Sequence, residues 1–226
     1  MSDAVDKLIS STPCLWKGRR SVQRSSAVLS TGYQQLDRVF PGGGWPLGVV
    51  VELLPESMGI GELRLFLPPV GYLTQNQRQV LMINAPYIPY APALLQAGLD
   101  LSYLLLLMPG NWRDALWAAE KALMNPACGM VVLWADNLLI GGGGFDDNKA
   151  IRRLQVAAQA GQTILVLYRF TKGSPQDQQM PWAAVRLRLL AKNKNLLLDV
   201  LKFRGLYKRF CVELDLGESI TESARV

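Results

Sequence analysis

Short apolar runs alternate with amphipathic stretches along most of the chain. Buried strands of a parallel sheet are continuous apolar runs, whereas a surface helix repeats its apolar residues every three or four positions. The apolar runs predict strands at residues 49–54, 80–84, 103–108, 130–134 and 163–168. Helical spacing predicts helices at residues 33–40, 62–75, 90–97, 112–124 and 147–160. Strands that alternate with helices indicate an α/β fold with a parallel sheet.

Two positions modify this simple alternation. Pro68-Pro69 lies inside the second predicted helix and is expected to kink or end it. Near the end of the chain, residues 183–190 and 196–203 are both strand-like, and the turn-forming sequence Lys192-Asn193-Lys194-Asn195 separates them. This pattern predicts a β-hairpin at the edge of the sheet.

The ends of the chain are more polar than its middle. Residues 1–29 are polar and basic with little periodicity, and we expect a flexible N-terminal arm there. The predicted elements then occupy one domain at residues 30–210, and residues 211–226 are expected to form a short polar tail. A domain of this length is large enough to bury a sizeable apolar core.

The composition restricts the chemistry that this domain could perform. The chain has 226 residues and no histidine, which excludes Ser-His-Asp and Cys-His nucleophile pairs, imidazole bases and histidine-containing metal sites. Its three cysteines, Cys14, Cys128 and Cys211, lack metal-ligand spacing and are expected to be free thiols. Catalysis would therefore need carboxylates, lysines, or a bound cofactor or metal ion.

The formal net charge of +6 is concentrated in two segments. Residues 1–30 carry a net +3 and residues 186–210 a net +7, so the remainder carries −4. Basic segments of this kind contact an anionic partner, either nucleic acid or an acidic protein face, or form a solvated surface. The chain has no apolar stretch of the roughly 20 residues that span a membrane, and its start lacks the apolar core of a signal peptide. We expect a cytoplasmic protein with no membrane partner.

The strand at residues 49–54 runs into a loop and then a helix, which is where a P-loop would lie. A working P-loop, GxxxxGK[ST], places its lysine on the phosphates and its hydroxyl on Mg²⁺. Gly59 fits the second glycine, but Leu54 stands at the first, Ile60 at the lysine and Gly61 at the hydroxyl position. Isoleucine cannot offset phosphate charge, and Glu62 would repel it. The loop therefore lacks the groups that bind and activate ATP.

Several segments resemble the opening of the RecA ATPase core. They are Ser30-Thr31-Gly32, Leu36-Asp37, residues 43–52, and the degenerate P-loop residues Pro55, Glu56, Ser57, Gly59, Ile60 and Gly61. The resemblance implies a RecA-like α/β core with a mostly parallel sheet, helices on both faces and a C-terminal β-hairpin.

The same resemblance identifies two further catalytic positions. Pro86 stands where RecA carries the glutamate thought to activate water, and Trp134 stands where the Mg²⁺-associated aspartate belongs. Asp136 could be a displaced remnant of that aspartate. With Ile60 at the lysine position, three catalytic places are apolar or proline, so we expect no ATP hydrolysis, no cofactor and no metal.

Among degenerate RecA cores, the chain resembles the ImuA family most. The segments that carry this resemblance include Pro41-Gly42-Gly43-Gly44-Trp45-Pro46, residues 85–92 and Trp117-Ala118-Ala119-Glu120. The related SulA proteins, which inhibit the cell-division protein FtsZ, are shorter and usually lack the segment at residues 30–48.

Membership of the ImuA family implies a non-catalytic accessory protein of the damage-inducible (SOS) translesion DNA synthesis machinery, acting as a protein–protein adaptor in mutagenesis. The implied partners are an ImuB-like polymerase-related protein, an error-prone polymerase III α subunit and RecA. A SulA-like inhibitor of cell division and a weak ATP-binding protein are the alternatives.

Two basic segments are candidates for contact with a partner or DNA. The candidate residues are Trp16, Arg19 and Arg20 in the arm, and Lys202, Arg204, Tyr207, Lys208 and Arg209 near the C-terminus. In the second segment Phe203 and Phe210 alternate with cations, a mixture that suits single-stranded DNA because rings stack on bases. Protein contact and a charged sheet edge are the other interpretations. Trp117 and Trp134 are expected in the core.

Overall fold

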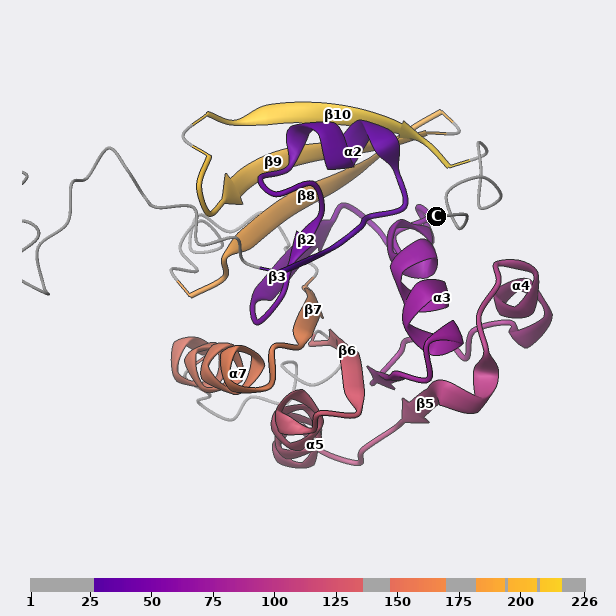
Figure 1. Cartoon of the computed structure of the whole chain (residues 1–226), viewed down its shortest axis with the longest axis vertical. Helices are drawn as coiled ribbons and strands as arrows, with labels where there is room; N and C mark the ends of the chain where they lie inside the picture. The colour runs from indigo at the N-terminus through magenta and orange to yellow at the C-terminus, as the bar shows by residue number, and fades with distance from the viewer. Residues whose placement is uncertain (1–26, 136–146, 170–181, 194, 207, 217–226) are drawn as a thin grey trace, which may run out of the picture.

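The computed structural model describes residues 27–135, 147–169, 182–193, 195–206 and 208–216, and its centre is an eight-stranded sheet (Figure 1). The strand order is β10-β9-β8-β3-β7-β6-β4-β5. The strands are β3 (Val50–Pro55), β4 (Gln79–Ile83), β5 (Leu104–Leu107), β6 (Cys128–Trp134), β7 (Ile164–Tyr168), β8 (Val185–Lys192), β9 (Asn195–Phe203) and β10 (Phe210–Asp215). Strands β8, β3, β7, β6, β4 and β5 run parallel, whereas β9 and β10 are antiparallel to their neighbours. The predicted α/β fold is confirmed, including its mostly parallel sheet and its closing hairpin.

Helices cover both faces of the sheet, as predicted. The larger core contains buried side chains of α2 (Gln34–Val39), α3 (Leu67–Gln75) and α4 (Ala91–Gln96). The second core lies between the opposite face and α5 (Trp112–Met124) and α7 (Asp147–Gly161). Two 3₁₀ helices, η1 (Arg64–Phe66) and η2 (Leu101–Tyr103), lead into α3 and β5. In the part of the chain that the structure describes, no helix is long and apolar enough to cross a membrane.

Local sequence explains where these elements begin. Every residue of β3 is buried, as expected of a central strand in a parallel sheet. Helix α5 begins after Asn111, whose side chain accepts a hydrogen bond from the Asp114 N–H over 3.0 Å, a common N-cap arrangement. Pro68 and Pro69 lie in the first turn of α3, where a missing N–H costs no hydrogen bond. These prolines begin the helix, so the expectation that they kink or end it is wrong.

Ordered structure is present in both segments that the sequence assigned to the flanks of the domain. Strand β1 (Val28–Leu29) lies within the residues assigned to the N-terminal arm, and it pairs with β2 (Trp45–Pro46) of the domain. Trp45 is fully buried and stacks on Phe66 with 4.8 Å between ring centroids, which anchors this small sheet to the core. At the other end, β10 occupies residues assigned to the polar tail. Its inward apolar residues Phe210, Val212 and Leu214 alternate with exposed residues, so this six-residue edge strand looks polar in sequence.

Two parts of the chain that were predicted to be buried, strand β5 and Trp117, carry exposed side chains. Strand β5 is an edge strand, and Leu105, Leu106 and Leu107 are 43%, 37% and 37% exposed. Trp117 is 62% exposed because it lies opposite Ala115 and Ala119, which face the sheet. The expectation that Trp117 belongs to the core is therefore wrong, whereas the expectation for Trp134 is confirmed, since it is 4% exposed.

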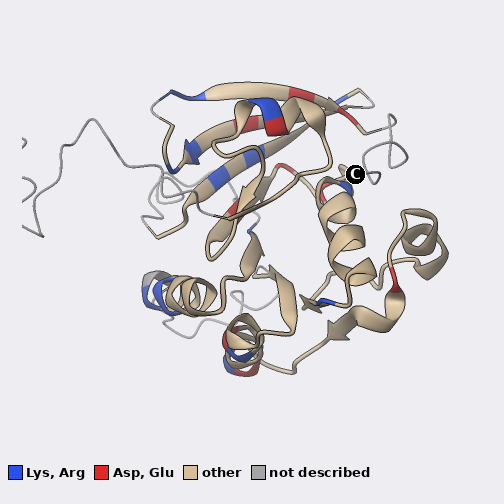
Figure 2. Cartoon of the chain, viewed as in Figure 1, with Lys and Arg blue, Asp and Glu red and all other residues tan. Residues whose placement is uncertain are grey.

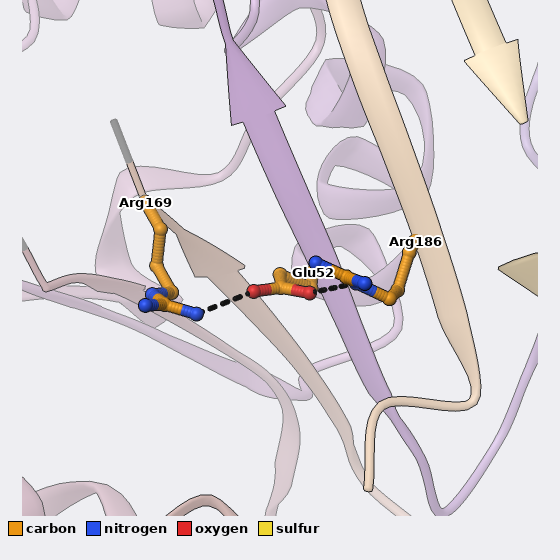
Figure 3. A network of polar contacts seen from close by, with 3 residues as sticks. All are labelled: Glu52, Arg169 and Arg186. Carbon is orange, nitrogen blue, oxygen red and sulfur yellow. Dashed lines mark hydrogen bonds and ion pairs between the residues drawn. The ribbon is translucent and has the colours of Figure 1, made fainter. Parts of the chain in front are cut away.

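A buried ion cluster lies among the central strands (Figure 3). The carboxylate of Glu52, in the middle of β3, is fully buried. It accepts a hydrogen bond from Arg169 Nη1 over 2.8 Å and another from Arg186 Nε. Arg169 directly follows β7 and Arg186 belongs to β8, so a single carboxylate ties both neighbours of β3 to it.

Candidate functional site

The loop between β3 and α3 occupies the position of a P-loop, at the carboxyl end of the central strand. Ile60, at the lysine position, is half-buried and packs against the larger core. Gly59 and Gly61 both have positive φ angles, +79° and +92°, which favour glycine. The loop thus keeps its glycine-dependent shape while the side chain that would meet a phosphate points into the protein.

The negative charge at this loop comes from the chain itself. Glu62 Oε1 accepts a hydrogen bond from the backbone N–H of Gly59 over 3.4 Å. In a phosphate-binding loop such N–H groups point to the anion, and here the Gly59 N–H points to a carboxylate. The next helix adds few donors, because α3 starts only at Leu67 and its first turn contains Pro68 and Pro69, which have no N–H.

Two aromatic side chains lie beneath the loop, at the ends of β6 and β7. The rings of Trp134 and Tyr168 stack in parallel with their centroids 5.0 Å apart. The Tyr168 hydroxyl donates a hydrogen bond to the backbone carbonyl of Glu62 over 2.9 Å. Complete burial raises the pKa of Tyr168 well above its usual value, and the nearby charge of Glu62 raises it further. The hydroxyl therefore stays protonated and remains a donor. The sequence patterns did not select Tyr168 as a site residue. The one feature that could have drawn attention to it is its place as an aromatic residue at the end of a buried strand.

Proline and asparagine lie where the neighbouring strand β4 ends. Pro86, at the glutamate position, is half-buried in the segment that follows β4. The preceding Asn84 is 4% exposed, has a φ of +56°, and donates its backbone N–H to the Leu107 carbonyl over 2.9 Å. Within the described residues, no three Cys, Asp or Glu side chains form a group that could hold a metal ion. Asp136 lies outside the described residues.

Figure 2 shows the Lys and Arg residues of the C-terminal strands in blue. Arg204, Lys208 and Arg209 are exposed, whereas Lys202 is half-buried in β9. The pKa of Lys202 is lowered, chiefly by burial and then by the positive charges of Arg204 and Arg186, although Glu52 partly opposes this. These cations are thus close enough to one another to repel.

The two described aromatic residues of that segment, Phe203 and Phe210, pack against the core. Phe203 is 3% exposed and packs on Phe40 with ring centroids 4.7 Å apart, and Phe210 is half-buried against the same core. Phe203 is therefore not available to stack on DNA bases, whereas contact of this segment with DNA stays a prediction. The remaining candidates Trp16, Arg19, Arg20 and Tyr207 lie outside the described residues, so their contact with a partner stays a prediction.

Eight exposed apolar side chains belong to the β5 edge of the sheet and its neighbours. They come from β5, the residue after it, the segment after β4, and α4, which lie at one side of the molecule (Figure 1). We call this set the β5 edge surface: Tyr87, Ile88, Tyr90, Leu95, Leu105, Leu106, Leu107 and Met108. Ile88 is 81% exposed and Tyr87 73%. Clusters of exposed apolar residues mark interaction sites on soluble proteins.

Comparison with known proteins relates the chain to RecA. It matches no family model. It is 30% identical over 112 residues to RecA of Streptomyces venezuelae and 29% identical over 117 residues to RecA of Halalkalibacterium halodurans. These matches cover 49% and 51% of this chain but 29% and 33% of the RecA proteins. The chain is therefore RecA-like, and its match spans about a third of the length of these curated relatives.

Proposed function

We propose that this chain is a non-catalytic, RecA-like accessory protein of the damage-inducible translesion DNA synthesis machinery, and that it acts as a protein–protein adaptor. Its similarity to RecA supports a role in DNA repair. The residues of the β3–α3 loop support the absence of catalysis, because Ile60 and Glu62 oppose the binding of a phosphate. The resemblance to the ImuA family supports the translesion assignment.

The observation that carries the adaptor role is the β5 edge surface. Among the described strands, β5 pairs with β4 alone, so its outer edge offers backbone N–H and C=O groups to another strand. Edge strands usually carry charged residues or proline that prevent such pairing, but β5 consists of four leucines. An extended segment of a partner could extend the sheet here and place its apolar side chains against Ile88 and Leu106.

The occupant that this surface fits is an extended apolar segment of a polymerase-related partner. Main-chain hydrogen bonds would supply part of the affinity, and burial of apolar side chains would supply the rest. We place that segment in the ImuB-like protein or in the error-prone polymerase III α subunit. The adaptor then raises the local concentration of its partners without any chemical step.

A binding assay with charged variants tests this function. The double variant Ile88→Asp and Leu106→Asp should weaken capture of the purified partner at least about tenfold, because each fully buried apolar side chain contributes about 1.5–3 kcal/mol. Val156→Asp is the matched control, since Val156 is 60% exposed but belongs to α7 on the other face of the sheet.

Two results would contradict the proposal. Equal capture of the partner by the wild type and the double variant would exclude the β5 edge surface. Binding to FtsZ without binding to either polymerase-related protein would instead favour a division inhibitor.

A further inference from the structure

We infer that the β3–α3 loop is an internally liganded loop, in which the chain's own carboxylate stands in for a phosphate and other side chains cover the site. A RecA-like fold implies a nucleoside triphosphate with Mg²⁺ at this position, and the residues present do not fit that ligand. The loop does not only lack catalytic residues. Side chains of the protein also make contacts with it where a nucleotide would bind.

The first of these contacts is electrostatic. Glu62 brings a negative charge to the Gly59 N–H, and its second oxygen, Oε2, is buried and has no hydrogen-bond partner among the residues that the structure describes. A phosphate at the same N–H would meet this carboxylate at close range, where two negative charges in a partly desolvated site repel strongly. Ile60 cannot compensate, and no hydroxyl is present at Gly61 to hold Mg²⁺.

The second and third contacts hold the loop in place. From below, the Tyr168 hydroxyl bonds to the Glu62 carbonyl, and Trp134 supports the Tyr168 ring. From the end of β10, the Leu216 side chain lies against the loop, since a Cβ added to Gly61 would come within 2.6 Å of Leu216 Cδ1. The loop is thus bonded from within by Glu62 and from outside by residues distant in the sequence.

This arrangement has a consequence for regulation. ATP binding cannot rearrange a loop whose anion position and surroundings are already filled by the protein. Partner binding at the β5 edge surface should then be the same with and without ATP and Mg²⁺, a consequence that rests on the proposed function. The state of the loop itself does not depend on any partner.

Amide hydrogen exchange of the full chain, followed by mass spectrometry of peptides covering residues 56–63, tests the inference. In the wild type, millimolar ATP with Mg²⁺, or inorganic phosphate, should leave exchange in these peptides unchanged. Glu62→Ala should speed their exchange several-fold, whereas Glu62→Gln, which retains an acceptor oxygen, should restore much of the protection. Leu216→Ala should speed exchange in the same peptides, while Leu206→Ala, at another half-buried leucine near the C-terminus, should not.

Two results of these exchange measurements would overturn the inference, and a third result would bear on the proposed function alone. Protection of residues 56–63 by ATP and Mg²⁺ in the wild type would show that the loop still takes nucleotide and would overturn the inference. Wild-type exchange rates in Glu62→Ala would show that the carboxylate is no ligand. Loss of partner capture with an unchanged, nucleotide-insensitive loop would instead count against the proposed function alone.

Discussion

Arg169 and Glu52 are 117 positions apart in the sequence, yet Arg169 Nη1 donates to Glu52 Oε1 over 2.8 Å in the interior of the protein (Figure 3). Because the side chains of Glu52, Arg169 and Arg186 are 0%, 12% and 7% exposed, water screens these ion pairs only weakly. The contact fixes the beginning of the segment after β7 relative to the strand that leads into the degenerate P-loop.

Glu52→Gln should therefore be strongly destabilising. The amide removes the negative charge between two largely buried arginines, and breaking a buried pair in this way costs about 3–5 kcal/mol of unfolding free energy. Urea unfolding followed by circular dichroism measures the change. Arg153→Gln is the control, because Arg153 pairs with Glu120 at 2.5 Å but is 67% exposed, so its loss should cost less than about 1 kcal/mol. Equal effects of the two substitutions would show that the buried cluster contributes no more than a surface pair.

Alanine at the two loop glycines should have unequal effects. Both glycines have positive φ angles, which cost an alanine about 1–2 kcal/mol. At Gly59 the added Cβ meets nothing within 4 Å, but at Gly61 it lies 2.6 Å from Leu216 Cδ1. Thermal unfolding should show a larger loss for Gly61→Ala, and adding Leu216→Ala should recover part of it. Independent, additive effects of Gly61→Ala and Leu216→Ala would contradict their contact.

Tyr168→Phe tests the hydrogen bond between β7 and the loop. The substitution keeps the stack on Trp134 but removes the donor to the Glu62 carbonyl, so we expect a loss of about 1–2 kcal/mol in denaturant unfolding. Tyr72→Phe is the control, since Tyr72 is 61% exposed on α3. A Tyr168→Phe protein as stable as this control would show that the bond contributes nothing net.

Cys128 should resist alkylation at neutral and mildly alkaline pH. Burial raises its pKa to about 11, an effect only partly offset by a backbone hydrogen bond from Met130 and by the charge of Arg78. Iodoacetamide at pH 8 should modify exposed Cys211 well before Cys128, and peptide mass spectrometry distinguishes the two.

The same pKa predicts how stability depends on pH. A thiol whose pKa is higher in the folded than in the unfolded state contributes stability below pH 9, the usual value for cysteine, and loses that contribution as the pH rises through about 11. Cys128→Ser should flatten this alkaline part of the stability profile. An unchanged profile would mean that Cys128 does not cause the alkaline loss.

The order of strands and helices was readable from the sequence because each element has its own apolar period. The β3 and β6 runs are buried on both sides, so their continuous apolar sequence had one interpretation. The same pattern failed at β5, because an apolar run does not show whether another strand lies beyond it. It failed at Trp117 for a related reason, since large apolar residues also occur on the outer face of a helix.

The candidate site was only partly predictable. The substitutions at Ile60, Pro86 and Trp134 could be read against a known motif, and their positions at the strand ends follow from the fold. The contacts of Glu62 with Gly59, of Tyr168 with the loop, and of Leu216 with Gly61 could not, because each depends on backbone turns or on segments far apart in the chain. For the ion cluster, the sequence contains one signal: the charged residue Glu52 lies within an otherwise apolar strand.

The two outer strands of the large sheet differ in charge, and this difference determines how many partner segments one copy of the chain can bind. Along β10, Glu213 and Asp215 place charges at the edge, and Glu213 is already engaged by Lys192 and Asn195. At the opposite boundary, the leucines of β5 carry no charge. A strand from another molecule therefore finds one receptive boundary among the described residues. One partner segment for each copy of the chain is the expected composition of the complex, and further growth of the sheet would have to begin from the partner.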